Sequence, residues 1–210
     1  MYTFIYIFNK IRWPFIARII KRDIITSKYY NKIESAPHAG SLCYDIQIMH
    51  NGLLIYKKSY CDGNYNKILT KTRGIFEPEV QYYFENTLSK LKENPVMIEL
   101  GSYWAFYSMW FLKDVNNGKV FLVDPSPKNL MHGMKNFSLN NLKGDFTCAF
   151  IAEKSYSKMN QIPTISLDSF ANEKDIQDIS VLHVDIQGYE LEMMKGAQKL
   201  FQDKKFNTYF

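Results

Sequence analysis

The chain has 210 residues and carries 26 Lys and Arg against 21 Asp and Glu, a net charge of +5. This length suits one buried core with an appendage rather than several domains. The excess charge lies in residues 1–34, which hold seven basic and two acidic residues, so the rest of the chain is neutral overall. A neutral body excludes the broad basic surface of a nucleic-acid-binding protein, and we expect no nucleic-acid partner.

The three cysteines, Cys43, Cys61 and Cys148, form no CxxC pair, and their odd number leaves one over. This indicates reduced thiols and a cytoplasmic protein. No triad of ligands at metal spacing is visible in the sequence, so we predict no metal site.

Residues 1–34 are expected to form a separate segment with a basic amphipathic helix, because Pro14 can open a helix. The apolar face at helical spacing is Phe15, Ile16, Ile19 and Ile20, and the opposite face is Arg18, Lys21 and Arg22. Two interpretations are open. The helix lies on an anionic membrane surface, which would place the protein at the inner face of a membrane. Alternatively, it covers the core of the protein, which Asp23 near the apolar face favours.

Residues 35–73 are predicted to contain a linker and a β-hairpin. Proline, glycine and small polar residues up to position 42 indicate the linker. Two β-type runs, 44–49 and 53–58, then flank the dipeptide Asn51-Gly52. This dipeptide favours a type I′ turn, because both residues accept a positive φ.

Residues 74–210 are predicted to form the main domain, which begins with a helix over 78–91. The apolar face of that helix is Val80, Phe84, Leu88 and Leu91. The next stretch is a short apolar run that ends in Glu99 and turns on Gly101 into a helix over 103–112. A buried parallel strand that enters a helix through a glycine turn has this pattern. Such turns are where α/β proteins bind nucleotides.

The strand over 119–123 ends in Asp124, 25 residues after Glu99. A Rossmann-type unit places an acid there that holds both ribose hydroxyls, so we expect an adenosine ligand. A dinucleotide would need the spacing G-x-G-x-x-G, but Tyr103 and Ala105 stand where further glycines would be. This argues against NAD or FAD and is tolerable for S-adenosylmethionine, which has no phosphate to bind.

The remaining elements alternate between helices and strands. They are a helix over 127–140, a third strand over 145–151, a strand over 181–184, a helix over 189–201 and the beginning of a fifth strand over 206–210. Such alternation predicts a parallel sheet with helices on its faces. The strand order would be 3-2-1-4-5.

The chemically richest block follows the strand over 181–184, where Asp185, Gln187 and Glu190 stand close together in the sequence. Ligands bind outside the carboxyl ends of strands at the switch point of such a sheet, so Asp185 should face the reactive end of the cofactor. The structural alternatives are hydrogen bonds from nearby backbone to Asp185, and a helix-dipole role for Glu190. Glu153, just past the third strand, either lies near the adenine or is a solvated loop charge.

Five blocks in this order resemble the FkbM-type methyltransferases. They are Gly74-Ile75-Phe76-Glu77-Pro78, Val96–Ala105, Asp124-Pro125-Ser126-Pro127, Ile165-Ser166-Leu167-Asp168 and Leu182–Glu190. The chain departs from the family pattern at Glu99, where Asp is usual, at Tyr103 and Ala105, where Asn and Gly are usual, and at Gln187, where Glu is frequent. The resemblance implies a Rossmann-like class I methyltransferase sheet that uses S-adenosylmethionine. The last strands of that sheet are missing here, so we expect either a fragment truncated at the C-terminus or a pared-down member. Members mostly methylate oxygens of sugars and polyketide-like compounds.

The resemblance and the strand-end positions together assign the site. The expected cofactor-binding residues are Glu99, Gly101, Ser102, Tyr103, Asp124, Pro125 and Glu153. Asp185 is expected to orient or deprotonate the acceptor hydroxyl, with Glu190 and Gln187 as helpers. We therefore expect an S-adenosylmethionine-dependent O-methyltransferase that acts on a carbohydrate or glycan.

A second interpretation is a non-catalytic, membrane-peripheral binding protein with a degenerate methyltransferase fold. The replacements at Tyr103 and Ala105 and the missing strands favour it. An uncovered edge strand of the short sheet could also pair with a second copy, so a homodimer is a further expectation.

Overall fold

The computed structural model describes residues 16–155 and 162–203. The chain divides into two compact units, Met1–Tyr83 and Phe84–Phe210. Helix α3 (Pro78–Leu88) contains the point of division. The segment boundaries expected after residues 34 and 73 stay predictions.

The first unit combines short helices with a three-stranded antiparallel sheet of order β1-β2-β3. Its elements are a helix over 16–26, η1 (Tyr30–Lys32), β1 (Leu42–Cys43), β2 (Ile46–Ile48), β3 (Leu54–Tyr56), η2 (Cys61–Gly63) and α2 (Asn66–Lys71). Its core cluster consists of Ile24, Tyr30, Ile33, Ile68 and Ile75.

The helix over 16–26 contributes to this core. Ile24 is buried in the cluster, and Ala17 and Ile20 pack against it. Asp23 lies on the exposed side, where its carboxylate accepts a hydrogen bond from Arg22 Nη2 at 3.0 Å. This packing supports the interpretation in which the helix covers a core.

The hairpin between β2 and β3 is confirmed, but its turn is not of type I′. Gly52 has a φ of +84°, whereas Asn51 is absent from the left-handed residues of the described chain. The amide of Gly52 donates to the carbonyl of Met49 at 3.0 Å, and Asn51 Oδ1 accepts from the amide of Leu53. These contacts are typical of a longer hairpin loop in which only the glycine is left-handed. β1 pairs with the other edge of β2 and begins at Leu42, the last residue of the expected linker.

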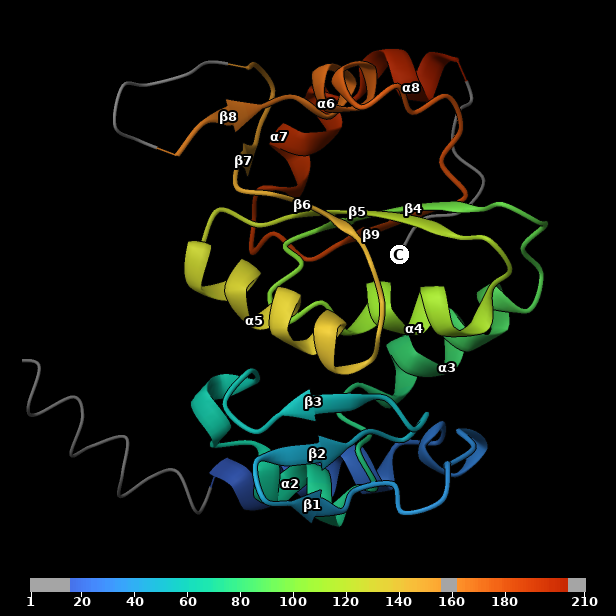
Figure 1. Ribbon diagram of the computed structural model, residues 1–210, viewed down its shortest axis with the longest axis vertical. Helices are drawn as coiled ribbons and strands as arrows, with labels where there is room; N and C mark the ends of the chain where they lie inside the picture. Colours follow the sequence, from blue (N-terminus) through green and yellow to red (C-terminus); the bar gives the residue numbers. More distant parts are fainter. Residues whose placement is uncertain (1–15, 156–161, 204–210) are drawn as a thin grey trace, which may run out of the picture. The chain divides into compact units, whose positions relative to one another are not determined.

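The second unit is built on a four-stranded parallel sheet of order β6-β5-β4-β9 (Figure 1). The strands are β4 (Val96–Leu100), β5 (Lys119–Val123), β6 (Asp145–Thr147) and β9 (Val181–Val184). In order of appearance this is 3-2-1-4, so the predicted Rossmann-like α/β fold is confirmed. The expected fifth strand over 206–210 lies outside the described residues.

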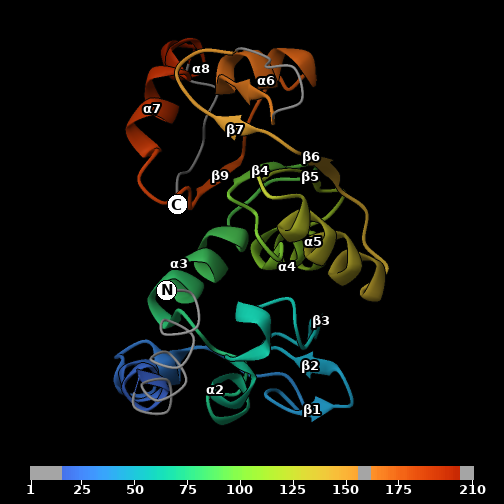
Figure 2. The ribbon, with the colours of Figure 1, turned by 90° about the vertical axis from the view of Figure 1, so that its left-hand side faces the viewer.

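Helices cover both faces of this sheet, as Figures 1 and 2 show. α4 (Phe106–Asp114) and α5 (Pro127–Leu139) lie on one face, and α6 (Leu167–Glu173), α7 (Glu190–Lys195) and α8 (Gln198–Gln202) lie on the other. Ile98 and Leu100 of β4 share a core cluster with Phe170 of α6 and Met193 of α7. A strand buried on both faces explains the continuous apolar run before Glu99.

Two expected elements of this unit are split. The strand expected over 145–151 ends at Thr147, and β7 (Phe150–Ile151) pairs instead with β8 (Thr164–Ile165) in a separate two-stranded sheet. The helix expected over 189–201 breaks at Gly196, where an added Cβ would overlap the carbonyl oxygen of Ala152.

Helix α3 ends at Leu88 rather than at residue 91, and its buried face differs from the apolar pattern. Val80 is 38% exposed, whereas Gln81 is fully buried. Gln81 Oε1 accepts hydrogen bonds from the amides of Phe76 and Glu77, both at 3.0 Å. Gln81 therefore satisfies backbone groups that the start of a helix leaves without partners.

Candidate functional site

The site expected from the sequence lies where the carboxyl ends of β4 and β9 meet. The Asp185 amide donates to the Leu100 carbonyl at 2.9 Å, so the chain continues alongside β4 after β9 ends. Gly101 has a φ of +77°, and a Cβ added to it would overlap the carbonyl oxygen of Asp185. Only glycine fits this turn, because both its conformation and the close backbone exclude a side chain.

Residues 102–105 form a loop between β4 and α4, so α4 begins at Phe106 rather than at the expected Tyr103. Tyr103 and Ala105 have φ values of +45° and +64°, which are unfavourable for residues with a side chain. The chain thus keeps a conformation that suits glycine without having glycine at these positions. We call residues 101–105 the cofactor loop, because the sequence predicts that they bind the cofactor.

The hydroxyl of Ser102 is an unpartnered polar group in this loop. Ser102 is 3% exposed, and its Oγ has no hydrogen-bond partner within residues 16–155 and 162–203. Buried hydroxyls are nearly always hydrogen-bonded, so this one calls for an explanation. A polar group of a bound cofactor would satisfy it, and the loop therefore fits such a ligand.

Asp124, at the end of β5, links the cofactor loop to the start of α5. Its Oδ2 accepts from the Tyr103 amide at 2.9 Å, and its Oδ1 accepts from the Ser126 amide at 2.8 Å. The side chain of Asn129 donates to both oxygens, at 3.1 and 3.3 Å. Asp124 is only 4% exposed. It stands where a ribose acid is expected and also holds the loop in place.

Glu99 lies beneath the loop and is 2% exposed. Its Oε2 accepts hydrogen bonds from the Ser108 amide at 3.1 Å and from the Ser108 hydroxyl. Burial raises the pKa of Glu99 to about 8, against the lowering effect of the bonds from Ser108. Glu99 is therefore mostly an uncharged acid at neutral pH, turned toward α4.

His183 of β9 is the nearest ionisable neighbour of Glu99 on that strand, with 3.9 Å between Nδ1 and Oε1. Burial lowers the pKa of His183 to about 4. Because both the His183 imidazole and the Glu99 acid are uncharged at neutral pH, the two side chains do not form an ion pair there. His183 is a core residue: it is 7% exposed, and its ring centroid lies 4.3 Å from that of Tyr107.

The three expected catalytic residues follow β9: Asp185 and Gln187 are exposed in a turn, and Glu190 is the exposed first residue of α7. Gln187 Nε2 donates to Asp185 Oδ1 at 2.7 Å. Glu190 Oε1 accepts from the Gly188 amide at 3.2 Å, and backbone hydrogen bonds lower the pKa of Glu190. Tyr189 in the same turn is 57% exposed. Two acids, an amide and an aromatic ring are thus exposed close together after β9.

Glu153 does not follow the third strand of the main sheet, because β6 ends at Thr147. It is an exposed residue after β7, and its role near an adenine stays a prediction. The residue directly after β6 is Cys148, whose Sγ donates to the Pro125 carbonyl at 3.7 Å. Burial, and then the charge of Asp124, raise the pKa of this free thiol.

Two residues near Asp124 were not expected in the site. Neither Cys148 nor Asn129 belongs to one of the motifs that the sequence offers for the site. The spacing of Asn129, five residues after Asp124 in the first turn of α5, was the available signal.

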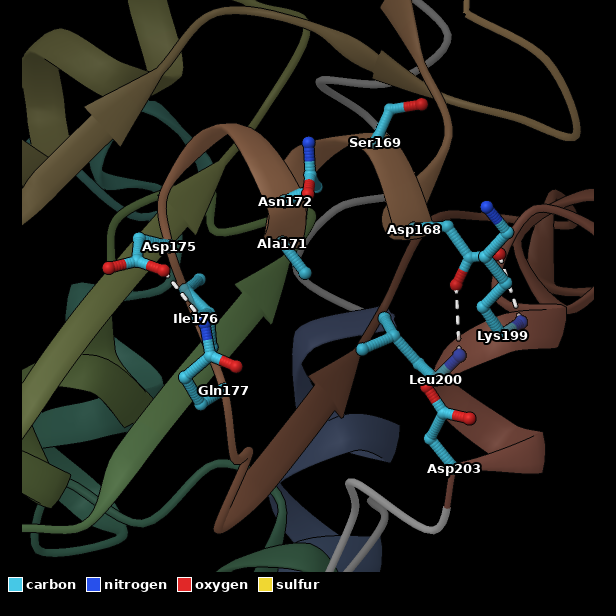
Figure 3. Close-up of a pocket in the computed structure, with 10 residues that line it drawn as sticks. All are labelled: Asp168, Ser169, Ala171, Asn172, Asp175, Ile176, Gln177, Lys199, Leu200 and Asp203. Atoms are coloured by element: carbon cyan, nitrogen blue, oxygen red, sulfur yellow. Dashed lines mark hydrogen bonds between the residues drawn. The ribbon is translucent and has the colours of Figure 1, made fainter.

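A cavity of about 350 Å³ lies elsewhere, between α6 and α8 (Figure 3). Asp168 in its wall accepts from the amides of Lys199 and Leu200, both at 3.0 Å, so it caps α8, while Ser166 caps α6. The cavity extends to residues just after Lys174, which binds Asp145 at the amino end of β6. The cavity thus reaches toward the amino ends of the strands, whereas the cofactor loop lies at their carboxyl ends. We therefore assign the cavity no part in the candidate site.

The parts of the chain that the structure describes contain no group of three or more His, Cys, Asp or Glu residues that could hold a metal ion. No helix in these parts has both the length and the apolar character needed to cross a bilayer.

The family model of the methyltransferase FkbM domain matches residues 82–210. No curated protein matches the chain. Among solved structures, the chain is similar to methyltransferase FkbM from Methylobacillus flagellatus KT, at 20% identity over 68% of this chain and 42% of that chain, with a TM-score of 0.42.

Two further solved structures are similar at lower identity. Precorrin-6y C5,15-methyltransferase from Geobacter metallireducens GS-15 is 16% identical over 60% of this chain and 57% of that chain, with a TM-score of 0.40. SMU.1697c from Streptococcus mutans in complex with SAH is 10% identical over 61% of this chain and 67% of that chain, with a TM-score of 0.41. The chain thus spans 42% and 57% of the FkbM and precorrin-6y structures.

Proposed function

Because the chain belongs to the FkbM methyltransferase family, we propose that it transfers a methyl group from S-adenosylmethionine to a hydroxyl oxygen of a carbohydrate or glycan. The observation that carries this proposal is the contact between the Gly101 turn and Asp185 at the carboxyl ends of β4 and β9. Ligands of open α/β sheets bind at this edge, where neighbouring strands lead in opposite directions.

The cofactor loop and the end of β5 would hold S-adenosylmethionine, which supplies an activated methyl group. Asp124 would accept hydrogen bonds from the ribose hydroxyls, and the buried Ser102 hydroxyl would pair with a polar group of the ligand. Gly101, Tyr103 and Pro125 would contribute backbone around it. We also propose that Glu99 and Glu153 contact the cofactor directly.

The exposed turn after β9 would receive the acceptor. Asp185 would align the hydroxyl with the methyl group and take up its proton as the oxygen–carbon bond forms and the sulfur–carbon bond breaks. Gln187 and Glu190 would orient neighbouring hydroxyls. The exposed ring of Tyr189 beside these polar groups suits a sugar, which has polar hydroxyls and apolar C–H faces.

Calorimetric titration with S-adenosylmethionine tests the cofactor half of this proposal. Asp124→Ala should weaken binding by about 1.5 to 3 kcal/mol, the range for hydrogen bonds to a charged group. Unchanged affinity in this variant would place the ribose elsewhere. No binding by the wild type would favour the alternative, a non-catalytic binding protein with this fold, which the strained Tyr103 and Ala105 support.

Transfer of a labelled methyl group to a panel of methyl glycosides tests the acceptor half. We expect label in at least one glycoside and none without protein. Cofactor binding combined with no transfer to any glycoside would contradict the carbohydrate acceptor while leaving the cofactor site in place.

We also propose peripheral membrane contact through residues 1–34, and a homodimer. Arg18 and Arg22 are exposed on the helix over 16–26 and could face anionic lipids. Deleting the segment would remove core residues such as Ile24, so the double variant Arg18→Ser and Arg22→Ser is the better test. It should co-sediment less with phosphatidylserine vesicles, and wild-type binding should weaken as the salt concentration rises.

Sedimentation equilibrium of the wild-type protein tests the proposed homodimer.

A further inference from the structure

Every lone pair of the Asp124 carboxylate faces a donor from the chain itself. A carboxylate accepts about four hydrogen bonds. Here Oδ1 accepts from the Ser126 amide and the Asn129 side chain, and Oδ2 accepts from the Tyr103 amide and the same Asn129 nitrogen. Two ribose hydroxyls could therefore bind Asp124 only after some of these donors leave.

The three donors are not equally able to leave. The Tyr103 amide belongs to the cofactor loop, and the Ser126 amide belongs to the residue that caps α5, where Ser126 Oγ accepts from the Asn129 amide. Moving either amide would move the backbone of the site. The Asn129 side chain is partly exposed and can turn into solvent by rotation about its own bonds. Its contacts are also the longest of the four, at 3.1 and 3.3 Å.

We propose that Asn129 is a positioning residue that occupies the ribose-binding oxygens of Asp124 until the cofactor displaces it. The proposal rests on the proposed function, because it takes Asp124 as the ribose acid. It goes further by assigning to this chain a side chain that competes with the ligand. Asn129 keeps the nearly buried carboxylate hydrogen-bonded before binding and thereby lowers the affinity for ribose-containing ligands.

The test is calorimetry with S-adenosylhomocysteine on the wild type and on Asn129→Ala. Removing the competing amide should tighten binding by about threefold to tenfold, the scale of one modest hydrogen bond. Lys135→Ala, an exposed change on the same helix, should leave the affinity unchanged.

A second pair of probes separates competition from a structural role. Adenosine carries the two hydroxyls and 2′,3′-dideoxyadenosine lacks them. Asn129→Ala should bind adenosine more tightly than the wild type does, with little gain for the dideoxy compound. If Asn129 only stabilised the start of α5, its loss would weaken both probes alike.

The outcomes distinguish this inference from the proposed function. Equal or weaker binding of S-adenosylhomocysteine by Asn129→Ala would overturn the role of Asn129, while a loss of affinity in Asp124→Ala would leave the ribose acid standing. Absence of binding in both proteins would overturn the inference and the proposed cofactor site together.

Discussion

A Cβ built on Gly133 of α5 would lie 3.1 Å from the Cβ of Ala105 in the cofactor loop. The helix therefore approaches the loop as closely as a glycine permits. Ala105 has a left-handed backbone conformation, with a φ of +64°. Alanine thus stands where the backbone conformation suits glycine, and glycine stands where the packing requires the smallest residue.

Ala105→Gly should stabilise the protein by about 0.5 to 1 kcal/mol, because glycine adopts the left-handed conformation without the clash that a Cβ causes. Urea unfolding followed by circular dichroism measures the change. Ala171→Gly is the matched control: Ala171 is equally buried but lies within α6, where glycine should cost about 1 kcal/mol. A loss of stability in both variants would mean that Ala105 carries no strain.

The two glycines of the strand-end turns should respond differently to the same substitution. In Gly101→Ala the new methyl group would overlap the Asp185 carbonyl, whereas a Cβ on Gly188 meets nothing within 4 Å. Both have positive φ, so both variants carry conformational strain of about 1 to 2 kcal/mol. Only Gly101→Ala must also push β4 and β9 apart.

We therefore expect Gly101→Ala to lower the melting temperature far more than Gly188→Ala, or to give insoluble protein. Thermal unfolding of the two variants side by side measures this. Similar melting temperatures would show that the close approach of Gly101 to Asp185 is relaxed in solution.

The buried Glu99 should make stability fall as the pH rises toward 8. Its pKa is raised to about 8 in the folded protein, so between its ordinary value of 4.5 and 8 the folded state binds more protons than the unfolded state. Stability then decreases with rising pH. His183, with a pKa lowered to about 4, acts oppositely between 4 and its ordinary value of 6.5. Above pH 6.5 His183 no longer contributes, and only the destabilising effect of Glu99 remains.

Urea unfolding from pH 6.5 to 8 should show a loss approaching about 1.4 kcal/mol per pH unit as the limit for one proton. Glu99→Gln keeps a group that can accept from Ser108 but cannot ionise, so it should flatten this slope. An equal slope in wild type and variant would assign the pH dependence to other groups.

The local patterns were sufficient to predict the centre of the fold. The apolar run before Glu99, the Gly101 turn and the acids at Asp124 and Asp185 indicated parallel strands and their order. The structure has that order in β6, β5, β4 and β9, and the family model confirms the FkbM resemblance. These features could be predicted because each depends on residues that are close together in the sequence.

Features that depend on contacts between residues far apart in the sequence could not be predicted in this way. The run over 145–151 looks like one strand, and only its pairing partners, β5 for one half and β8 for the other, divide it. Asp168 lies in the first turn of α6, yet its carboxylate caps α8, about thirty residues further on. Likewise, nothing local showed that the Asn129 amide reaches the Asp124 carboxylate.

The acid after β9 provides the last prediction. If Asp185 orients and deprotonates the acceptor hydroxyl, Asp185→Asn should lower turnover by roughly 10²- to 10⁴-fold, because the amide keeps the shape but cannot take a proton. Cofactor affinity should barely change. Asp178→Asn is the control, since Asp178 is exposed shortly before β9, near the other end of the same strand. The measurements are methyl transfer to an identified acceptor and calorimetry with S-adenosylhomocysteine. Loss of both turnover and affinity would make Asp185 a cofactor or structural residue, and full turnover would shift the role of base to Glu190.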